Sequence, residues 1–224
     1  MLDTDAAKRV GQGVGIIDDC ACVLNQTNLG ANHNKFYIMQ ALRTASGDCY
    51  VFTRWGRVGL VGQMACKPAR DAGSARRHFE KVFLTKTGNH WATARRSFVP
   101  QPKKYDLVHT VGPSMTRRRT SSVRPHVPTR MDKETFDLVR WILDADMFKH
   151  AMQSYQVDLK KCPLGAISKK QVSKGFAILE DIDGLVRHIV GAPTHAQRQQ
   201  LEALSSRFYT VIPHACGMRT PPVI

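Results

Sequence analysis

The apolar residues of this chain change their spacing partway along it, and that change limits the folds the chain can adopt. The early apolar residues fall in short strand-like runs at 22–29, 35–43, 49–55 and 57–66. In the second run Phe36, Ile38 and Leu42 alternate with period two, as in a strand that buries one face. Later apolar residues recur at helical spacing. We therefore expect an α+β chain in which a small antiparallel sheet precedes an all-α bundle.

One helix and one further strand complete the first predicted domain. The apolar residues that predict the helix are Ala75, Phe79, Val82 and Phe83. Gly88 follows them, where a C-terminal cap belongs. A last short strand is predicted at residues 105–108. The domain predicted from these elements spans residues 20–108 and packs its sheet against one helix.

Two segments flank this domain in the prediction. Residues 1–19 carry three closely spaced glycines among polar neighbours, and no strand precedes them, so we expect a flexible tail rather than a phosphate-binding loop. Residues 109–131 hold three prolines, five arginines and no acidic residue. Such a composition is typical of a solvated basic linker.

Residues 132–224 are predicted to be helical. Ser168 fits the N-cap of one helix and Pro193-Thr194 the start of another. The predicted core positions are Phe136, Val139, Ile142, Leu143, Met147, Ala151, Met152 and Tyr155 in two early stripes, Val172, Phe176, Leu179, Ile182 and Val186 in the third, and Leu201, Leu204, Phe208 and Val211 in the fourth.

The net charge of +15 points to a polyanionic partner. Residues 1–108 carry a net +8 and residues 109–131 a net +5, whereas residues 132–224 carry only +2. Nucleic acid is the first interpretation of this asymmetry, with an anionic membrane surface or a generally basic protein as alternatives. No stretch approaches the length of a membrane span. With nucleic acid as the preferred polyanion, we expect no membrane partner.

The six cysteines are scattered and include no C-x-x-C pair, so the spacing of a structural zinc site is missing. We expect reduced thiols, no bound metal and an intracellular compartment.

The string Arg54-Trp55-Gly56-Arg57 combines groups suited to a nucleic-acid backbone. Trp offers a flat face for a base or sugar, and Arg binds phosphate bidentately. The Trp-Gly-Arg tripeptide within this string is a weak signal alone, because Trp55 could equally be a half-buried core residue.

A longer set of motifs makes the signal specific. The segments concerned are LNQTNL at 24–29, NHNKFY at 32–37, RWGRVG at 54–59, GNHW at 88–91 and KKYDLV at 103–108. Their order and spacing resemble the WGR domain of DNA-damage-responsive poly(ADP-ribose) polymerases. Residues 162–179 and 208–224 resemble the helical regulatory domain that lies upstream of the catalytic domain in these enzymes. The chain is most similar to the short members that lack zinc fingers.

The resemblance implies roles for particular residues. Trp55 would stack on the exposed terminus of a DNA strand break, and Arg57 would lie between the DNA and the helical domain, so that both take part in interdomain coupling. The remaining DNA-binding positions that it implies are Asn32, Asn34 and Lys35 near a 5′ phosphate, and Tyr105. Lys and Asn donors of this kind position a backbone without reading its sequence, so binding should be independent of sequence.

The resemblance also sets expectations for chemistry. We find no counterpart of the family's His-Gly-Ser, glycine-rich Tyr segment or catalytic Glu, and so expect no catalytic residue and no cofactor in this chain. NAD+ would be the substrate of a downstream catalytic domain, and the nucleus would be the compartment.

Three functions remain open from the sequence. The leading hypothesis is the break-sensing and autoinhibitory portion of a DNA-repair polymerase. The alternative is a non-catalytic WGR-containing protein that binds DNA ends, and a basic RNA-binding protein is the third.

Overall fold

The structure is a computed structural model that describes residues 2–11, 13–111 and 166–224. The elements of the first part are α1 (Thr4–Val10), β1 (Gly15–Asn28), β2 (His33–Arg43), β3 (Cys49–Arg57), β4 (Gln63–Ala69), α2 (Ala72–Thr87), α3 (Trp91–Ala94), β5 (Asp106–Val108) and β6 (Thr110–Val111). The second part contains β7 (Ala166–Ile167), α6 (Lys169–Arg187) and α7 (His195–Val211). The predicted α+β class is confirmed.

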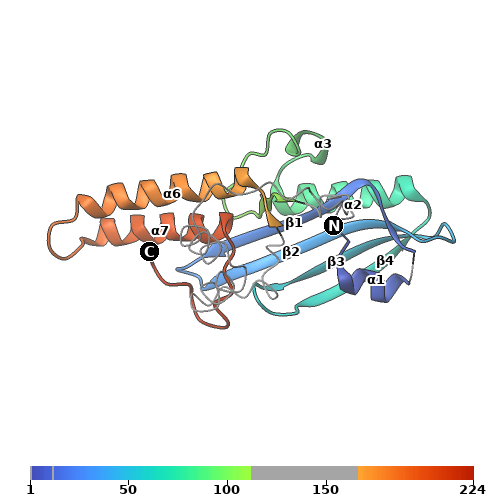
Figure 1. Cartoon of the computed structure of the whole chain (residues 1–224), viewed down its shortest axis with the longest axis horizontal. Helices are drawn as coiled ribbons and strands as arrows, with labels where there is room; N and C mark the ends of the chain where they lie inside the picture. The colour runs from blue at the N-terminus through green and yellow to red at the C-terminus, as the bar shows by residue number, and fades with distance from the viewer. Residues whose placement is uncertain (1, 12, 112–165) are drawn as a thin grey trace, which may run out of the picture.

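Five strands form one antiparallel sheet in the order β4-β3-β2-β1-β5. Helix α2 covers one face of this sheet, and α1 lies on the other side beside β3 and β4 (Figure 1). The register between β2 and β3 is continuous from Lys35, opposite Arg57, to Arg43, opposite Cys49. The sheet therefore holds the ends of its two central strands in a fixed relation to each other.

Helix α2 forms where the helical spacing predicts it. Asp71 caps its start by accepting a hydrogen bond from the Ser74 amide, and Gly88 ends it in the left-handed conformation. The side chains that this helix buries against the sheet include Ala75, Phe79 and Phe83. Their burial joins α2 to the alternate residues of β2 and β3 that point to the same face.

The N-terminal segment differs from the predicted flexible tail. Residues 4–10 form a helix, and β1 already begins at Gly15. Ala6 is buried against Leu42 and Phe52 on the face of the sheet opposite α2. Too few apolar residues mark this short helix for its periodicity to be visible in the sequence.

The two described helices begin at the predicted caps. Ser168 caps α6, and Thr194 caps α7 through a capping box with Gln197. The two helices lie side by side, and α7 reaches the end of the sheet near β1 (Figure 1). The early helical stripes at 136–155 and most of the predicted linker lie outside the described residues, but residues 110–111 of that linker form β6, which pairs with β7.

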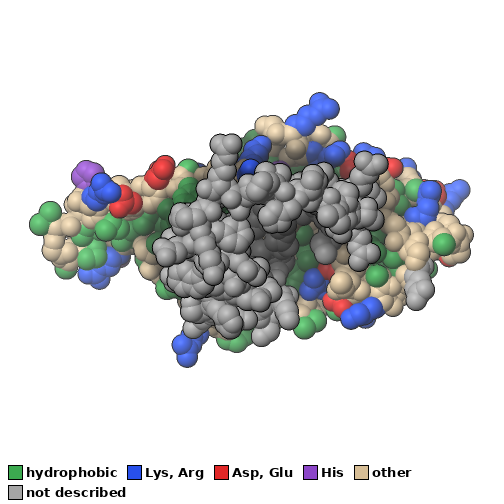
Figure 2. Space-filling view, in the orientation of Figure 1, with side chains coloured by type: hydrophobic (Ala, Val, Ile, Leu, Met, Phe, Trp, Pro, Cys, Tyr) green, Lys and Arg blue, Asp and Glu red, His purple; other side chains and the backbone are tan. Residues whose placement is uncertain are grey.

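The predicted inward face of α6 is correct only in part. Leu179 and Ile182 pack in the core with α7 as predicted. Val172, Phe176 and Val186 are exposed, and Gly175 and Ile178 are buried instead. Hydrophobic side chains are accordingly visible on the surface of the helical hairpin (Figure 2). The predicted α7 positions Leu201, Leu204, Phe208 and Val211 do pack in this small core.

Asp106 lies at the boundary between the sheet and the helical hairpin, where burial disfavours the charged form of its carboxyl group. Burial raises the pKa of Asp106 to about 6, although Lys174 and Arg207 partly oppose this rise. Because the folded pKa exceeds the unfolded value, ionised Asp106 destabilises the folded chain, and this cost disappears as the pH falls through 6 towards 4.

We predict that Asp106→Asn stabilises the chain at pH 8, by up to about 3 kcal/mol for a pKa shift of this size. Well below pH 4 this gain should disappear, because Asp106 is then protonated in both the folded and the unfolded state. Urea unfolding at both pH values measures the difference. A variant that is less stable at pH 8 would contradict this account.

Candidate nucleic-acid interface

Three aromatic side chains form a cluster at the end of the sheet where β2 begins. The Tyr37 and Trp55 rings are opposite each other on β2 and β3 and stack at 6.0 Å between centroids with an interplanar angle of 20°. Tyr105, just before β5, meets Tyr37 edge to face at 6.0 Å. These three residues are the aromatic cluster. Trp55 is partly exposed, so its ring is shared between the core and the surface.

Two lysines lie over this aromatic cluster. The Lys35 ammonium is 5.5 Å from the centroid of Tyr105, and the Lys86 ammonium is 4.8 Å from that of Tyr37. Such cation–π contacts hold a positive charge beside an aromatic surface without neutralising it. The arrangement suits a nucleic-acid strand, whose phosphates can contact the lysines and whose flat bases can stack on the aromatic rings.

Burial raises the pKa of both Tyr37 and Tyr105. Both hydroxyls therefore stay protonated at neutral pH and add no negative charge beside the lysines. The electrostatic character of the aromatic cluster is set by Lys35 and Lys86.

Arg57 joins the sheet to the C-terminal segment, residues 212–219. Its guanidinium donates to the Asn32 backbone oxygen at 2.9 Å and to the Asn32 side-chain oxygen at 2.8 Å. It also donates to the Arg219 carbonyl at 2.6 Å and to the Gly217 carbonyl. One side chain thus fixes the β1–β2 turn and the C-terminal segment to the end of β3. Asn32 itself has a positive φ of 48°, a conformation that Asn tolerates better than most residues.

Asn34 is buried, and its side chain faces the protein. Its amide nitrogen donates to the His214 carbonyl at 2.9 Å, and its side-chain oxygen accepts from Thr27 at 3.3 Å. A direct contact between Asn34 and a phosphate would require these hydrogen bonds to break. The sequence-predicted residues therefore separate into an aromatic group with Lys35, Trp55 and Tyr105, and an interdomain group with Asn32, Asn34 and Arg57.

The residues of β1 that dock α7 were not predicted from the sequence. Asn25 is completely buried, and its amide donates to the carbonyls of Tyr209 at 2.8 Å and Thr210 at 3.0 Å. It thereby satisfies two of the carbonyls that a helix leaves free at its C-terminal end. The amides of Thr27 and Leu29 donate to Thr210 Oγ1 and Ser206 Oγ. The signal for Asn25 was only its place inside the LNQTNL motif.

Gly59 allows the C-terminal segment to approach the turn between β3 and β4. A Cβ atom at this position would lie 2.6 Å from the Cβ of Ala215, and the φ of 90° also favours glycine. Arg57 and Gly59 together hold the segment against the end of the sheet.

Contrary to what the sequence suggested, Arg54 is not placed to contact a nucleic-acid backbone. Its guanidinium is paired with Asp3 rather than directed to the surface beside Trp55. Tyr37 and Lys86 are the members of the site that sequence reasoning missed. Tyr37 could have been found by pairing the two predicted strands, since it is the residue of β2 directly opposite Trp55.

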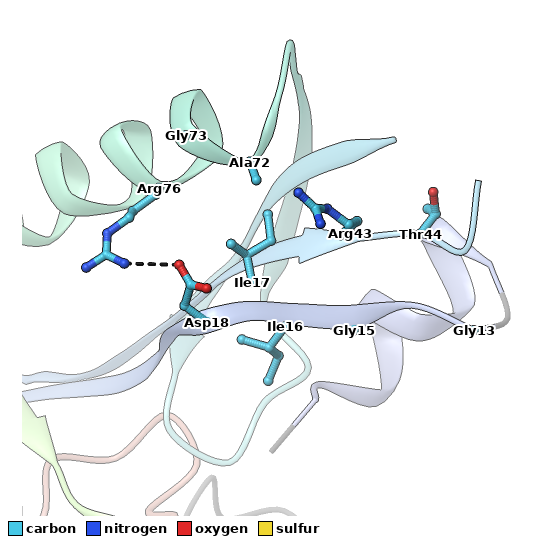
Figure 3. A pocket seen from close by; sticks show the side chains of 10 residues that line it. All are labelled: Gly13, Gly15, Ile16, Ile17, Asp18, Arg43, Thr44, Ala72, Gly73 and Arg76. Atoms are coloured by element: carbon cyan, nitrogen blue, oxygen red, sulfur yellow. Dashed lines mark hydrogen bonds and ion pairs between the residues drawn. The ribbon is translucent and has the colours of Figure 1, made fainter. Parts of the chain in front are cut away.

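A separate hollow of about 380 Å³ lies at the opposite end of the sheet (Figure 3). It is bordered by Arg43 at the end of β2, by Gly73 and Arg76 at the start of α2, and by Asp18. Arg76 pairs with Asp18 at 3.0 Å, so part of its charge is compensated. Because β2 runs the length of the sheet between Lys35 and Arg43, this hollow is not part of the aromatic site.

Within residues 2–11, 13–111 and 166–224, no group of three or more His, Cys, Asp or Glu side chains could hold a metal ion. None of the described helices is long and apolar enough to cross a membrane.

Two family models match the chain. The WGR domain matches residues 20–98, and the poly(ADP-ribose) polymerase regulatory domain matches residues 129–224.

Individual relatives match across both domains. Protein mono-ADP-ribosyltransferase PARP3 from Mus musculus is 39% identical over 95% of the chain and 40% of its own length. The protein of the same name from Gallus gallus is 40% identical over 100% of the chain and 43% of its own length. Poly [ADP-ribose] polymerase 2 from Homo sapiens is 35% identical over 90% of the chain and 35% of its own length. The chain thus spans about two fifths or less of the length of these relatives. It belongs to the poly(ADP-ribose) polymerase family and carries a WGR domain followed by the regulatory domain of that family.

Proposed function

We propose that this chain binds DNA strand breaks through its WGR domain and that this binding changes the conformation of the helical regulatory domain. The observation that carries the proposal is the position of Arg57. Arg57 follows Trp55 by two residues on β3 and pairs with Lys35 on β2, and its guanidinium is hydrogen-bonded to the C-terminal segment at Gly217 and Arg219. A ligand at this end of the sheet would therefore meet both domains at once.

The aromatic cluster supports binding at an exposed DNA terminus. A broken end leaves a base pair unstacked on one side, and the partly exposed Trp55 ring offers it a flat apolar face. Tyr37 stacks on that ring, and Tyr105 in turn packs edge to face on Tyr37. Such stacking does not distinguish one base from another, which fits recognition of a break rather than of a sequence.

The lysines support contact with the backbone. Lys35 is the third residue of β2, close to the Asn32 turn, so a phosphorylated 5′ end near this turn would meet a cation already held beside Tyr105. Asn32 has an exposed side chain that could contact the same strand. For Asn34, burial and the bond to His214 support an indirect role, in which it orders the turn for its neighbours.

The contacts of Arg57 and Asn32 support the coupling. Any movement of the Asn32 turn on DNA binding changes the acceptors of Arg57, and the same guanidinium holds the C-terminal segment. Since allosteric coupling requires that a ligand favour one of two states, shared hydrogen bonds of this kind supply the differential contact. The regulatory domain would then control a catalytic domain that uses NAD+ to transfer ADP-ribose, in the nucleus and during DNA repair.

Replacing the Trp55 ring tests the proposal most simply. Trp55→Ala should weaken binding to a nicked or blunt-ended duplex by about 1–3 kcal/mol, the usual effect of removing one stacked aromatic. Fluorescence anisotropy with a labelled duplex measures the dissociation constant.

Phe176→Ala is the matched control, because Phe176 is an exposed aromatic on α6 away from the cluster. An unchanged dissociation constant for Trp55→Ala would refute the stacking role. Competition with structured RNA belongs in the same experiment, and a clear preference for RNA would overturn the assignment to DNA.

Lys35→Ala should weaken binding to the same degree for duplexes of different sequence. The slope of log affinity against log salt should fall by about one, as expected for one lost phosphate contact. Titrations at several salt concentrations measure this slope. Lys67→Ala serves as a control, because Lys67 is an exposed lysine on β4 opposite Val51, away from the aromatic cluster. A loss that depends on the DNA sequence would indicate base readout instead of a phosphate contact.

A further inference from the structure

The residue that precedes Trp55 is held by the N-terminal helix. Arg54 donates from Nε at 3.0 Å and from Nη2 at 2.7 Å to the same carboxylate oxygen of Asp3. The Asp3 side chain is only 4% exposed and that of Arg54 19% exposed. Buried charges that are paired and hydrogen-bonded in this way hold their geometry, because separating them leaves a charge without water.

Asp3 is itself fixed from two sides. Its second carboxylate oxygen accepts from the amides of Asp5 at 2.9 Å and Ala6 at 3.4 Å, and so caps α1. Its own amide donates to the buried side chain of Gln40 on β2 at 3.0 Å. The position of the carboxylate therefore depends on α1 being folded against the sheet.

Arg54 passes this constraint to the turn between β3 and β4, residues 58–62. Its Nη1 donates to the Val61 carbonyl at 3.2 Å, and its guanidinium lies over Phe36 at 5.3 Å. The turn folds back closely on the strand, since a Cβ atom on Gly62 would lie 2.4 Å from the carbonyl oxygen of Trp55. Gly59 in the same turn faces Ala215 of the C-terminal segment.

We propose that α1 is a working part of the DNA-end site, in which Asp3 acts through Arg54 as a positioning residue for Trp55, Arg57 and the 58–62 turn. This inference rests on the function proposed above for Trp55. The helix lies outside the WGR match, which begins at residue 20, so its contribution is additional to the matched domain. Arg54 is accordingly a structural arginine and not a phosphate contact.

The test compares Asp3→Asn with Asp5→Asn in the full chain. Asp5 lies in the same helix but pairs with Lys8 at 3.6 Å and is not among the residues hydrogen-bonded to Arg54. Hydrogen exchange without DNA reports on two turn amides, Val58, which donates to Asn34, and Leu60, which donates to Arg57. Anisotropy reports on affinity for a blunt-ended duplex, with Trp55→Ala measured alongside.

We expect Asp3→Asn to speed exchange at Val58 and Leu60, to leave exchange in α2 unchanged and to weaken DNA-end binding about tenfold, or 1.4 kcal/mol. Asp5→Asn should change none of these. Unchanged exchange at the turn, or an equal loss of protection in α2, would overturn the role of Asp3. Wild-type affinity of Asp3→Asn beside a loss in Trp55→Ala would also overturn it and would leave the proposed function standing. Wild-type affinity of Trp55→Ala would instead refute the proposed function, while the exchange data would still decide whether Asp3 orders the turn.

Discussion

The hydrogen bonds of Arg57 are the interaction on which the rest of the arrangement depends. One guanidinium binds the Asn32 turn and the C-terminal segment together at the end of the central strands. Its planar fork matches several acceptors at once, which a lysine at this position could not do. The proposed DNA site and the contact between the sheet and the helical hairpin therefore share this residue. An effect of DNA binding on the helical hairpin would then need to act only across the Arg57 side chain.

The contact between sheet and helical hairpin is mainly polar. Asn25 and Asn34 donate from buried side chains to carbonyls at and beyond the end of α7, and Thr27 and Leu29 donate from the backbone. Polar contacts of this kind need good geometry, because a buried group without a partner costs about 1–3 kcal/mol. Such an interface is specific in its alignment yet easier to rearrange than an apolar core. That balance suits a regulatory contact.

Much of the fold could be predicted from spacing alone, whereas the site could be predicted only in part. The strand alternation at Phe36 and Ile38 and the caps at Gly88 and Ser168 predict elements that the structure contains, because these depend on local sequence. The face of α6 could be assigned only in part, since Phe176 and Gly175 are adjacent and only the packing of α7 decides which one is buried. It could likewise not be predicted that Asn34 is buried against the C-terminal segment while Lys35 lies beside Tyr105. This difference depends on the hydrogen bond from Asn34 to His214, which is far along the chain.

In the proposed function, DNA bound at the aromatic cluster alters the helical domain through Arg57. The decisive experiment is hydrogen exchange across residues 166–224, measured with and without a nicked duplex in the wild type and in Arg57→Ala. DNA should change exchange in α6 and α7 of the wild type, and this change should be lost in Arg57→Ala although the variant still binds the duplex. An unaltered response in Arg57→Ala, or no response of the helices in the wild type, would contradict it.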